Sequence, residues 1–316
     1  MVVDFQYRLF RNSLLILSLF SLIFWGCTQG DTPKKVSLLK RTPLVSAGEE
    51  YKREDVLQFG FDLRLGPKED VRIYTPFIKY LEDTTGKRFR IKFTEKYEDT
   101  IDNLGKGVTA FSAIGSLSYV MGRDRYGDTI AYLVSGVNTE GDARYRAVIF
   151  TTPDSTIETI GDIKNKSFAF GSKMSTLGHL VPRKMLDDAG ITLEDLSSVR
   201  YTGSHINTVR AVVNGEFEAG GIQEGLAARL VSEGKIKIIK RSVPYPSSII
   251  AFNRDMESRI VEEVKSALLE FVPEGKHKHM LIDWEKTEMP LGFTRISESE
   301  FYKIAILARK YGLIQQ

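Results

Sequence analysis

From residue 56 onward the chain alternates short apolar runs with segments of helical periodicity. Residues 56–61 form such a run, and apolar side chains then recur at positions 74, 77, 78 and 81, the spacing of one helix face. Gly86 follows this stretch, and residues 88–94 alternate apolar and charged side chains as a half-exposed strand does. Further strand candidates lie at 110–114, 145–151, 167–171, 199–201, 217–222 and 235–239. Strands interleaved with helices predict an α/β protein with mostly parallel sheets flanked by helices.

The length of the chain allows more than one folded unit. Its 316 residues suffice for two domains, each with its own core. With 42% apolar and 27% charged residues, the composition is typical of a folded globular protein. In parallel α/β sheets, ligands bind beyond the carboxyl ends of the strands. Polar residues that follow strands are therefore the candidates for a site.

The N-terminus has the pattern of an export signal. Arg8 and Arg11 precede the largely apolar residues 14–25, and Gly26 and Cys27 follow. This apolar run is too short to span a bilayer comfortably, which favours a signal at 1–26 over a membrane span. Cys27 is the only cysteine, and its place after the signal suits lipidation. We therefore expect an exported protein, anchored by lipid to the extracytoplasmic face of the cell membrane or to the outer membrane through a tether at 27–54. The alternative is an uncleaved signal anchor with an incidental cysteine.

The charge balance gives no reason to expect nucleic acid as a partner. The formal net charge of +3 falls to +2 without residues 1–26, which contain two arginines and one aspartate (42 basic minus 40 acidic residues). Any selectivity for anions must therefore come from a local site.

One candidate site follows the strand predicted at 167–171. Ser175 and Thr176 stand there at the start of a helix predicted over 177–189. A helix start leaves unpaired backbone N–H groups with about half a positive charge, so these hydroxyls would complete a cradle for an anion. Serine and threonine are also the ordinary N-cap residues. Both interpretations remain open from this segment alone.

A second turn repeats the arrangement. The strand predicted at 199–201 ends in Thr202-Gly203-Ser204-His205 before another helix. The imidazole of His205 donates a hydrogen bond in either protonation state. Two such turns favour an anion site, whereas a histidine at a helix start is by itself a common capping or packing residue.

No catalytic or cofactor motif stands out, so we expect a binding protein without a cofactor and not an enzyme. The G-x-x-x-x-G-K-[ST] loop and the G-x-S-x-G elbow are absent. Segments 37–40 and 232–235 match S-x-x-K, but the companion S-D-N and K-T-G motifs are missing. His277 and His279 lie among lysines without a cysteine or carboxylate cluster, so no metal site is expected there.

Short motifs follow one another in a specific order between residues 154 and 215. They are Asp154-Ser155, Ile160-Gly-Asp-Ile-Lys164, Phe168-Ala-Phe170, Ser175-Thr-Leu-Gly178, Leu180-Val-Pro182, Gly203-Ser-His205 and Ala211-Val-Val-Asn-Gly215. This order resembles the phosphate/phosphite/phosphonate solute-binding proteins of ABC transporters. The resemblance implies a two-lobe periplasmic-binding-protein (type II) fold, whose chain crosses between lobes twice and whose ligand closes them about a hinge. We accordingly expect one lobe at 55–148 plus 249–316 and the other at 149–248.

The resemblance also implies a set of ligand-binding residues. They are Tyr97, Tyr145, Ser175, Thr176, Leu177, His205 and Ser248. The family has a serine where this chain has Leu177, so one hydroxyl donor is missing. Where aminoalkylphosphonate binders place an aspartate for the ligand's ammonium group, this chain has Ser248. Because a buried ammonium without a partner is costly, an oxyanion without an ammonium arm is favoured.

The resemblance implies capture of a solute and not catalysis. We expect a monomeric, lipid-anchored component that binds a small phosphorus oxyanion (phosphate, phosphite or simple phosphonate) and delivers it to the permease of an ABC transporter. One alternative is a ligand sensor for a membrane receptor or kinase. Another is a degenerate surface lipoprotein that no longer binds oxyanions.

Overall fold

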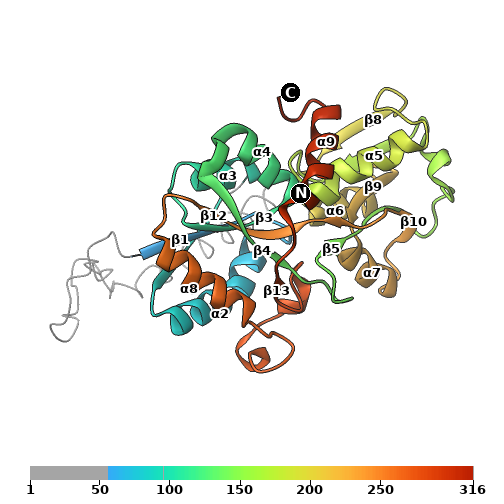
Figure 1. Ribbon diagram of the computed structural model, residues 1–316. Coiled ribbons are helices and arrows are strands. Elements are labelled where there is room, and N and C mark those ends of the chain that lie inside the picture. The colour runs from blue at the N-terminus through green and yellow to red at the C-terminus, as the bar shows by residue number, and fades with distance from the viewer. Residues whose placement is uncertain (1–55, 95, 316) are drawn as a thin grey trace, which may run out of the picture. The chain divides into compact units, whose positions relative to one another are not determined.

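The computed structural model describes residues 56–94 and 96–315, which form two large β-sheets, each flanked by helices, and one two-stranded sheet (Figure 1). The predicted signal at 1–26, Cys27 and the tether at 27–54 lie outside these residues. We call the six-stranded sheet with its helices the larger lobe and the five-stranded sheet with its helices the smaller lobe. This two-lobe α/β architecture confirms the predicted fold class. Within the described ranges, no helix combines the length and apolar character that crossing a membrane requires.

The larger lobe has the strand order β13-β4-β12-β3-β1-β2. Its elements are β1 Val56–Phe61, α2 Pro67–Thr85, β2 Arg88–Lys92, α3 Tyr97–Gly105, β3 Phe111–Gly115, α4 Ser116–Tyr126, β4 Ile130–Gly136, β12 Ser248–Asn253, α8 Ser258–Leu269, β13 Phe293–Thr294 and α9 Tyr302–Lys310. Helices α2 and α8 cover one face of the sheet, and α3, α4 and α9 cover the other. Successive residues of a strand point to opposite faces of the sheet, so Ile249 and Ile250 of β12 enter opposite cores. Both faces of the sheet are therefore apolar.

The smaller lobe has the strand order β10-β6-β9-β7-β8. Its elements are β6 Ala147–Thr151, β7 Ser167–Phe170, α5 Val181–Asp188, β8 Ser198–Tyr201, α6 His205–Val213, β9 Ala219–Gln223, α7 Glu224–Ser232 and β10 Lys237–Arg241. Helices α6 and α7 cover one face, and α5 packs on the other. A π-helical turn, Thr176–Leu180, precedes α5.

Two neighbouring segments connect the lobes. The short strands β5 (Arg144–Tyr145) and β11 (Tyr245–Pro246) pair with each other in antiparallel fashion. The strands that follow them then enter different sheets, β6 the smaller and β12 the larger.

The expectation of mostly parallel sheets needs one correction, because both sheets are mixed. Strands β1, β2, β3 and β4 point the same way, but β12 lies between β3 and β4 and runs antiparallel to both. In the smaller sheet, β6 is likewise antiparallel to β9 and β10. Strands β12 and β6 each follow a connection from the other lobe, so each begins at the edge of the sheet where its neighbouring strands end. Each therefore runs in the opposite direction to those neighbours.

Candidate functional site

Polar residues of both lobes meet where the strands end. In the larger lobe, Asp62 and Arg64 follow β1, and Ser118 lies in the first turn of α4, directly after β3. In the smaller lobe, Thr176 begins the π-helical turn after β7, and His205 is the first residue of α6, after β8. This is the edge at which α/β sheets bind ligands.

Hydrogen bonds join the two lobes directly at this edge. The Thr176 hydroxyl accepts from the backbone N–H of Leu117 at 2.9 Å, near the start of α4. The Ser118 hydroxyl lies 3.4 Å from the carbonyl oxygen of Met174. Thr176 thus meets one of the unpaired N–H groups that a helix start presents.

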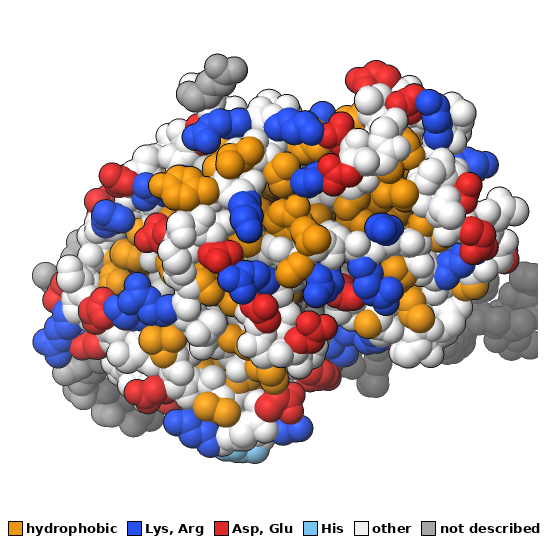
Figure 2. Space-filling model, turned by 45° about the vertical axis from the view of Figure 1, so that its right-hand side comes forward, with side chains coloured by type: hydrophobic (Ala, Val, Ile, Leu, Met, Phe, Trp, Pro, Cys, Tyr) orange, Lys and Arg blue, Asp and Glu red, His pale blue; other side chains and the backbone are white. Residues whose placement is uncertain are grey.

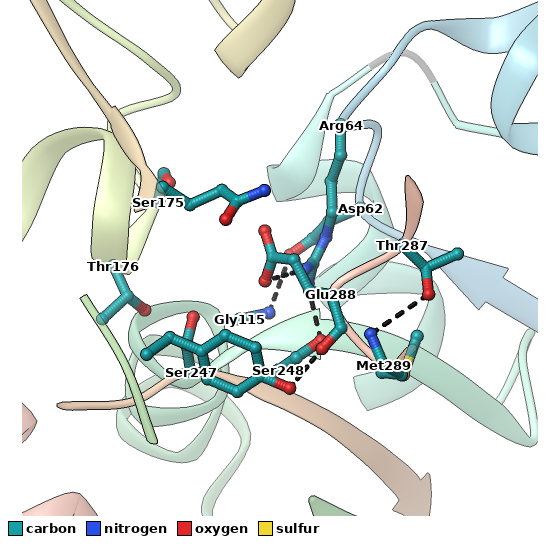
Figure 3. A network of polar contacts seen from close by, with 12 residues as sticks. Asp62, Arg64, Gly115, Ser175, Thr176, Ser247, Ser248, Thr287, Glu288 and Met289 are labelled. Atoms are coloured by element: carbon teal, nitrogen blue, oxygen red, sulfur yellow. Dashed lines mark hydrogen bonds and ion pairs between the residues drawn. The ribbon is translucent and has the colours of Figure 1, made fainter. Parts of the chain in front are cut away.

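Arg64 is a buried cation at the centre of the site. Its side chain is 11% exposed, forms an ion pair with Glu288 and donates to the Ser248 hydroxyl at 3.2 Å. Figure 3 shows Arg64 and Glu288 pointing toward each other, with Ser248 beside them. Burial alone would lower the pKa of Arg64, but the adjacent Glu288 carboxylate raises it above its ordinary value.

The Glu288 carboxylate lies between the lobes. Its second oxygen is 3.7 Å from Nε2 of His205, and the residue is 6% exposed. Tyr145, on the connecting strand β5, donates its hydroxyl to the backbone carbonyl of Glu288. The carboxylate therefore faces Arg64 of the larger lobe and His205 of the smaller lobe at once.

Core contacts hold the segment that carries Glu288. The Trp284 indole packs against Phe77 with ring centroids 4.9 Å apart, and its Nε1–H donates to the Met289 carbonyl at 2.8 Å. Met289 is fully buried, and a Cβ on Gly136 would lie 2.3 Å from its Cγ. Glu288 thus extends from a backbone anchored on both sides.

Asp62 is a second buried carboxylate. Its Oδ2 accepts from the Gly115 N–H at 3.1 Å and from the Ser118 hydroxyl at 3.0 Å. In the described part of the chain, Oδ1 has no hydrogen-bond partner. Burial raises the pKa of Asp62 to about 7, although Arg64 and these hydrogen bonds lower it. Its proton is therefore released near neutral pH.

His205 is neutral at physiological pH. Burial lowers its pKa to about 4, against the opposing effect of Glu288. Its Nδ1 has no hydrogen-bond partner among the described residues. A Cβ on Gly178 would lie only 3.0 Å from Cε1 of this ring, so a glycine permits the close approach. The neutral imidazole retains one N–H donor for a ligand.

The structure brings some of the predicted site residues to this edge. Thr176, His205, Tyr145 and Ser248 make the contacts described above. Tyr97 is buried at the start of α3, and burial, followed by the charge of Asp62, raises its pKa well above its ordinary value.

Two predicted residues make other contacts. The Ser175 hydroxyl accepts from the Gly178 N–H at 2.9 Å and so caps the π-helical turn. Leu177 is 1% exposed and packs in the core.

Three charged residues of the site escaped prediction: Asp62, Arg64 and Glu288. The first two directly follow the strand at 56–61, so the rule that sites form at carboxyl ends of strands would have found them. Glu288 precedes β13 in an irregular segment without periodicity, and no local signal marks it.

Glu288 also forms part of the wall between two cavities. The inner one, of ≈ 20 Å³, is lined by Arg64, Tyr74 and His205 among others. The outer groove, of ≈ 340 Å³, includes Arg146 and Arg229. Gln223, Leu226, Lys286, Thr287 and Glu288 line both.

The face of the molecule shown in Figure 2 adds little charge selectivity. On the face in Figure 2, basic and acidic side chains are interspersed. No group of three or more His, Cys, Asp or Glu residues within 56–94 and 96–315 is placed to hold a metal ion. The buried residues therefore decide the chemistry of the site.

Known proteins resemble this chain over most of its length. The family model described as "ABC transporter, phosphonate, periplasmic substrate-binding protein" matches residues 59–301. A probable ABC transporter phosphite-binding protein, PhnD1 of Prochlorococcus marinus, is 24% identical over 283 residues, which cover 83% of this chain and 87% of that protein. The phosphate-import protein PhnD of Mycolicibacterium smegmatis is 23% identical over 208 residues, or 61% and 64% of the two chains.

A solved structure shows the same fold. PhnD1 of Prochlorococcus marinus in complex with methylphosphonate has a TM-score of 0.74 at 19% identity, covering 82% of this chain and 99% of that one. The predicted resemblance is thereby confirmed. Because the family model spans well over half of the chain, the protein belongs to the periplasmic substrate-binding proteins of phosphonate ABC transporters, which are exported binding proteins and not enzymes.

Proposed function

We propose that the protein is anchored by lipid on Cys27 and captures a small phosphorus oxyanion, namely phosphate, phosphite or a simple phosphonate, for the permease of an ABC transporter. The residues from Arg8 to Cys27 support export and anchoring. The names of the two curated relatives, one for phosphite and one for phosphate, support the ligand class. We further propose that the protein acts as a monomer with one lobe at 55–148 plus 249–316 and the other at 149–248.

The observation that carries the ligand class is the buried guanidinium of Arg64 at the meeting point of the lobes. Arginine binds oxyanions through several N–H donors of fixed geometry. His205 adds a donor from the other lobe. Because donors come from both lobes, ligand binds their closed arrangement best and favours closure.

Ser248 supports an oxyanion without an ammonium arm. Its hydroxyl accepts from Arg64, so a cationic arm at this position would meet the guanidinium. Like charges at such short range repel strongly in a buried site.

A ligand panel tests the oxyanion proposal. Phosphate, phosphite, methylphosphonate, 2-aminoethylphosphonate and sulfate are titrated into the purified protein by calorimetry, with thermal unfolding in parallel. A ligand at about 100 times its Kd stabilises the fold by about 2.7 kcal/mol. We expect a phosphorus oxyanion to bind, and methylphosphonate to bind more tightly than 2-aminoethylphosphonate. Absence of binding by every phosphorus compound at millimolar concentration would refute the ligand class.

The anchor is tested separately. Cys27→Ser should move the protein from the membrane fraction to the soluble fraction of cells, since one thiol carries the proposed lipid. Unchanged membrane association of this variant would exclude the lipid anchor without touching the ligand proposal.

A further inference from the structure

The Glu288 carboxylate occupies a position in the site that favours an anion. It contacts the Arg64 guanidinium and lies 3.7 Å from Nε2 of His205, with only 6% of the residue exposed. These two groups, one from each lobe, would also bind the oxygens of a ligand. The protein's own carboxylate and a ligand anion therefore have the same partners.

Charge makes simultaneous occupation unfavourable. The Glu288 carboxylate already balances the buried Arg64 guanidinium. Asp62, whose pKa burial raises to about 7, carries part of a further negative charge near neutral pH. His205 is neutral at physiological pH and offers no compensating charge. An added oxyanion next to Glu288 would repel it across a few ångströms of low-dielectric interior. Binding at Arg64 thus requires that the carboxylate move away.

The structure offers the side chain a place to go. Glu288 also lines the outer groove of ≈ 340 Å³, whose other charged lining residues balance, with three basic ones (Arg146, Arg229 and Lys286) and three acidic ones (Glu140, Glu224 and Glu285). In this open groove a carboxylate can be hydrated, which the buried position beside Arg64 does not allow. The backbone on either side is anchored by Trp284 and Met289. Glu288 lines both the inner cavity and the outer groove. Rotation of its side chain alone would therefore move the carboxylate away from Arg64 and into the groove.

We propose that Arg64 is the principal anion ligand of the site and that Glu288 is a built-in competitor, which the incoming oxyanion displaces from Arg64 toward the outer groove. This inference rests on the proposed function and deepens it, because it names the determinant of selectivity. An anion binds only if it gains more from Arg64 and His205 than the carboxylate does. A compact tetrahedral oxyanion with two negative charges meets this condition. Acetate carries the same carboxylate group as Glu288 and therefore does not.

The central experiment is Glu288→Gln, which keeps the shape of the side chain and removes its charge. Affinities for phosphate, phosphite, methylphosphonate, 2-aminoethylphosphonate and acetate are measured by calorimetry on the purified protein, with melting temperatures of ligand-free samples. We expect the best phosphorus ligand to bind about tenfold more tightly or better, since the competing charge is gone. The ligand-free variant should melt at a lower temperature than the natural protein, because Arg64 loses its partner. Acetate should gain measurable binding.

Matched substitutions separate the site from its surroundings. Glu270→Gln makes the same change at an exposed residue of the larger lobe that lines neither cavity, and it should leave affinity and melting temperature unchanged. Arg64→Gln should weaken oxyanion binding about a hundredfold or more, since a charged hydrogen-bonding partner is lost. The exposed Arg254→Gln is its control.

The outcomes distinguish the two proposals. If the natural protein binds a phosphorus oxyanion and Glu288→Gln binds it equally or more weakly, Glu288 is not a competitor and only this inference fails. Weaker binding of 2-aminoethylphosphonate by Glu288→Gln would likewise overturn it, because Glu288 would then be a partner of the ligand's ammonium group. If Glu288→Gln binds a phosphorus oxyanion and the natural protein does not, the inference is supported. If neither protein binds any oxyanion, both proposals are wrong.

Discussion

Replacement of Asp62 by asparagine tests the electrostatics of the buried edge. The side chain is 2% exposed, and burial raises its pKa from 3.8 to about 7. Between these values the folded protein holds a proton that the unfolded chain has released. This group therefore contributes stability that is complete below about pH 4 and is lost as the pH rises through about 7. At ~1.4 kcal/mol per pH unit, the full effect is roughly 4 kcal/mol.

Comparison of Asp62→Asn with the natural protein isolates the contribution of Asp62 to the pH dependence of stability. The pKa values of His205 and His179 are lowered to about 4 by burial, so both histidines reduce stability as the pH falls below about 6.5. They are present in both proteins and cancel in the difference. Asparagine preserves an acceptor for Gly115 and Ser118 but cannot titrate.

Urea unfolding from pH 4 to pH 8 measures this difference. Relative to the natural protein, Asp62→Asn should gain roughly 4 kcal/mol in free energy of unfolding between pH 4 and pH 8. The exposed Asp99→Asn serves as the matched control. A difference that does not change with pH would show that Asp62 does not hold its proton in the folded state, and the argument from burial would be wrong.

Two further predictions concern the smaller lobe. Gly178→Ala should weaken oxyanion binding by about tenfold, because its Cβ would lie 3.0 Å from Cε1 of His205 and 2.9 Å from the Ser175 hydroxyl, and the imidazole must shift. Gly161→Ala, whose Cβ would meet only Thr159 at 3.6 Å, should leave the calorimetric titration unchanged; equal affinities for the two variants would contradict the role given to His205. Ser175→Ala should lower the free energy of unfolding by ~1 kcal/mol in urea titrations, since its hydroxyl caps the π-helical turn. A loss of affinity at unchanged stability would instead assign this hydroxyl to the ligand.

Elements with strong local periodicity were predicted well. The strand expected at 56–61 is β1, and the periodic stretch before Gly86 is α2. Gly86 has a φ of 65°, the left-handed conformation of a helix C-cap. These elements depend on residues near one another in the chain, which sequence patterns report directly.

Other elements carried no clear pattern. Helix α4 was not predicted, because Ser116 and Ser118 are polar yet buried and interrupt the apolar period of its inner face. Strand β4 is buried along its whole length, so its continuous apolar run does not distinguish strand from helix. The antiparallel course of β12 also had no signal, because strand direction depends on the connection from the other lobe.

The sequence by itself determined the α/β alternation and the polar turns at Ser175 and His205, and it predicts an export signal that ends before Cys27. Each depends on spacing within a short stretch of chain, where periodicity, capping and charge are already expressed. Tertiary structure alone decided that Arg64 meets Glu288 and that Asp62 loses its contact with water. Ion pairing and pKa depend on distances in space and on the surrounding dielectric, and both arise only when segments far apart in the chain pack together.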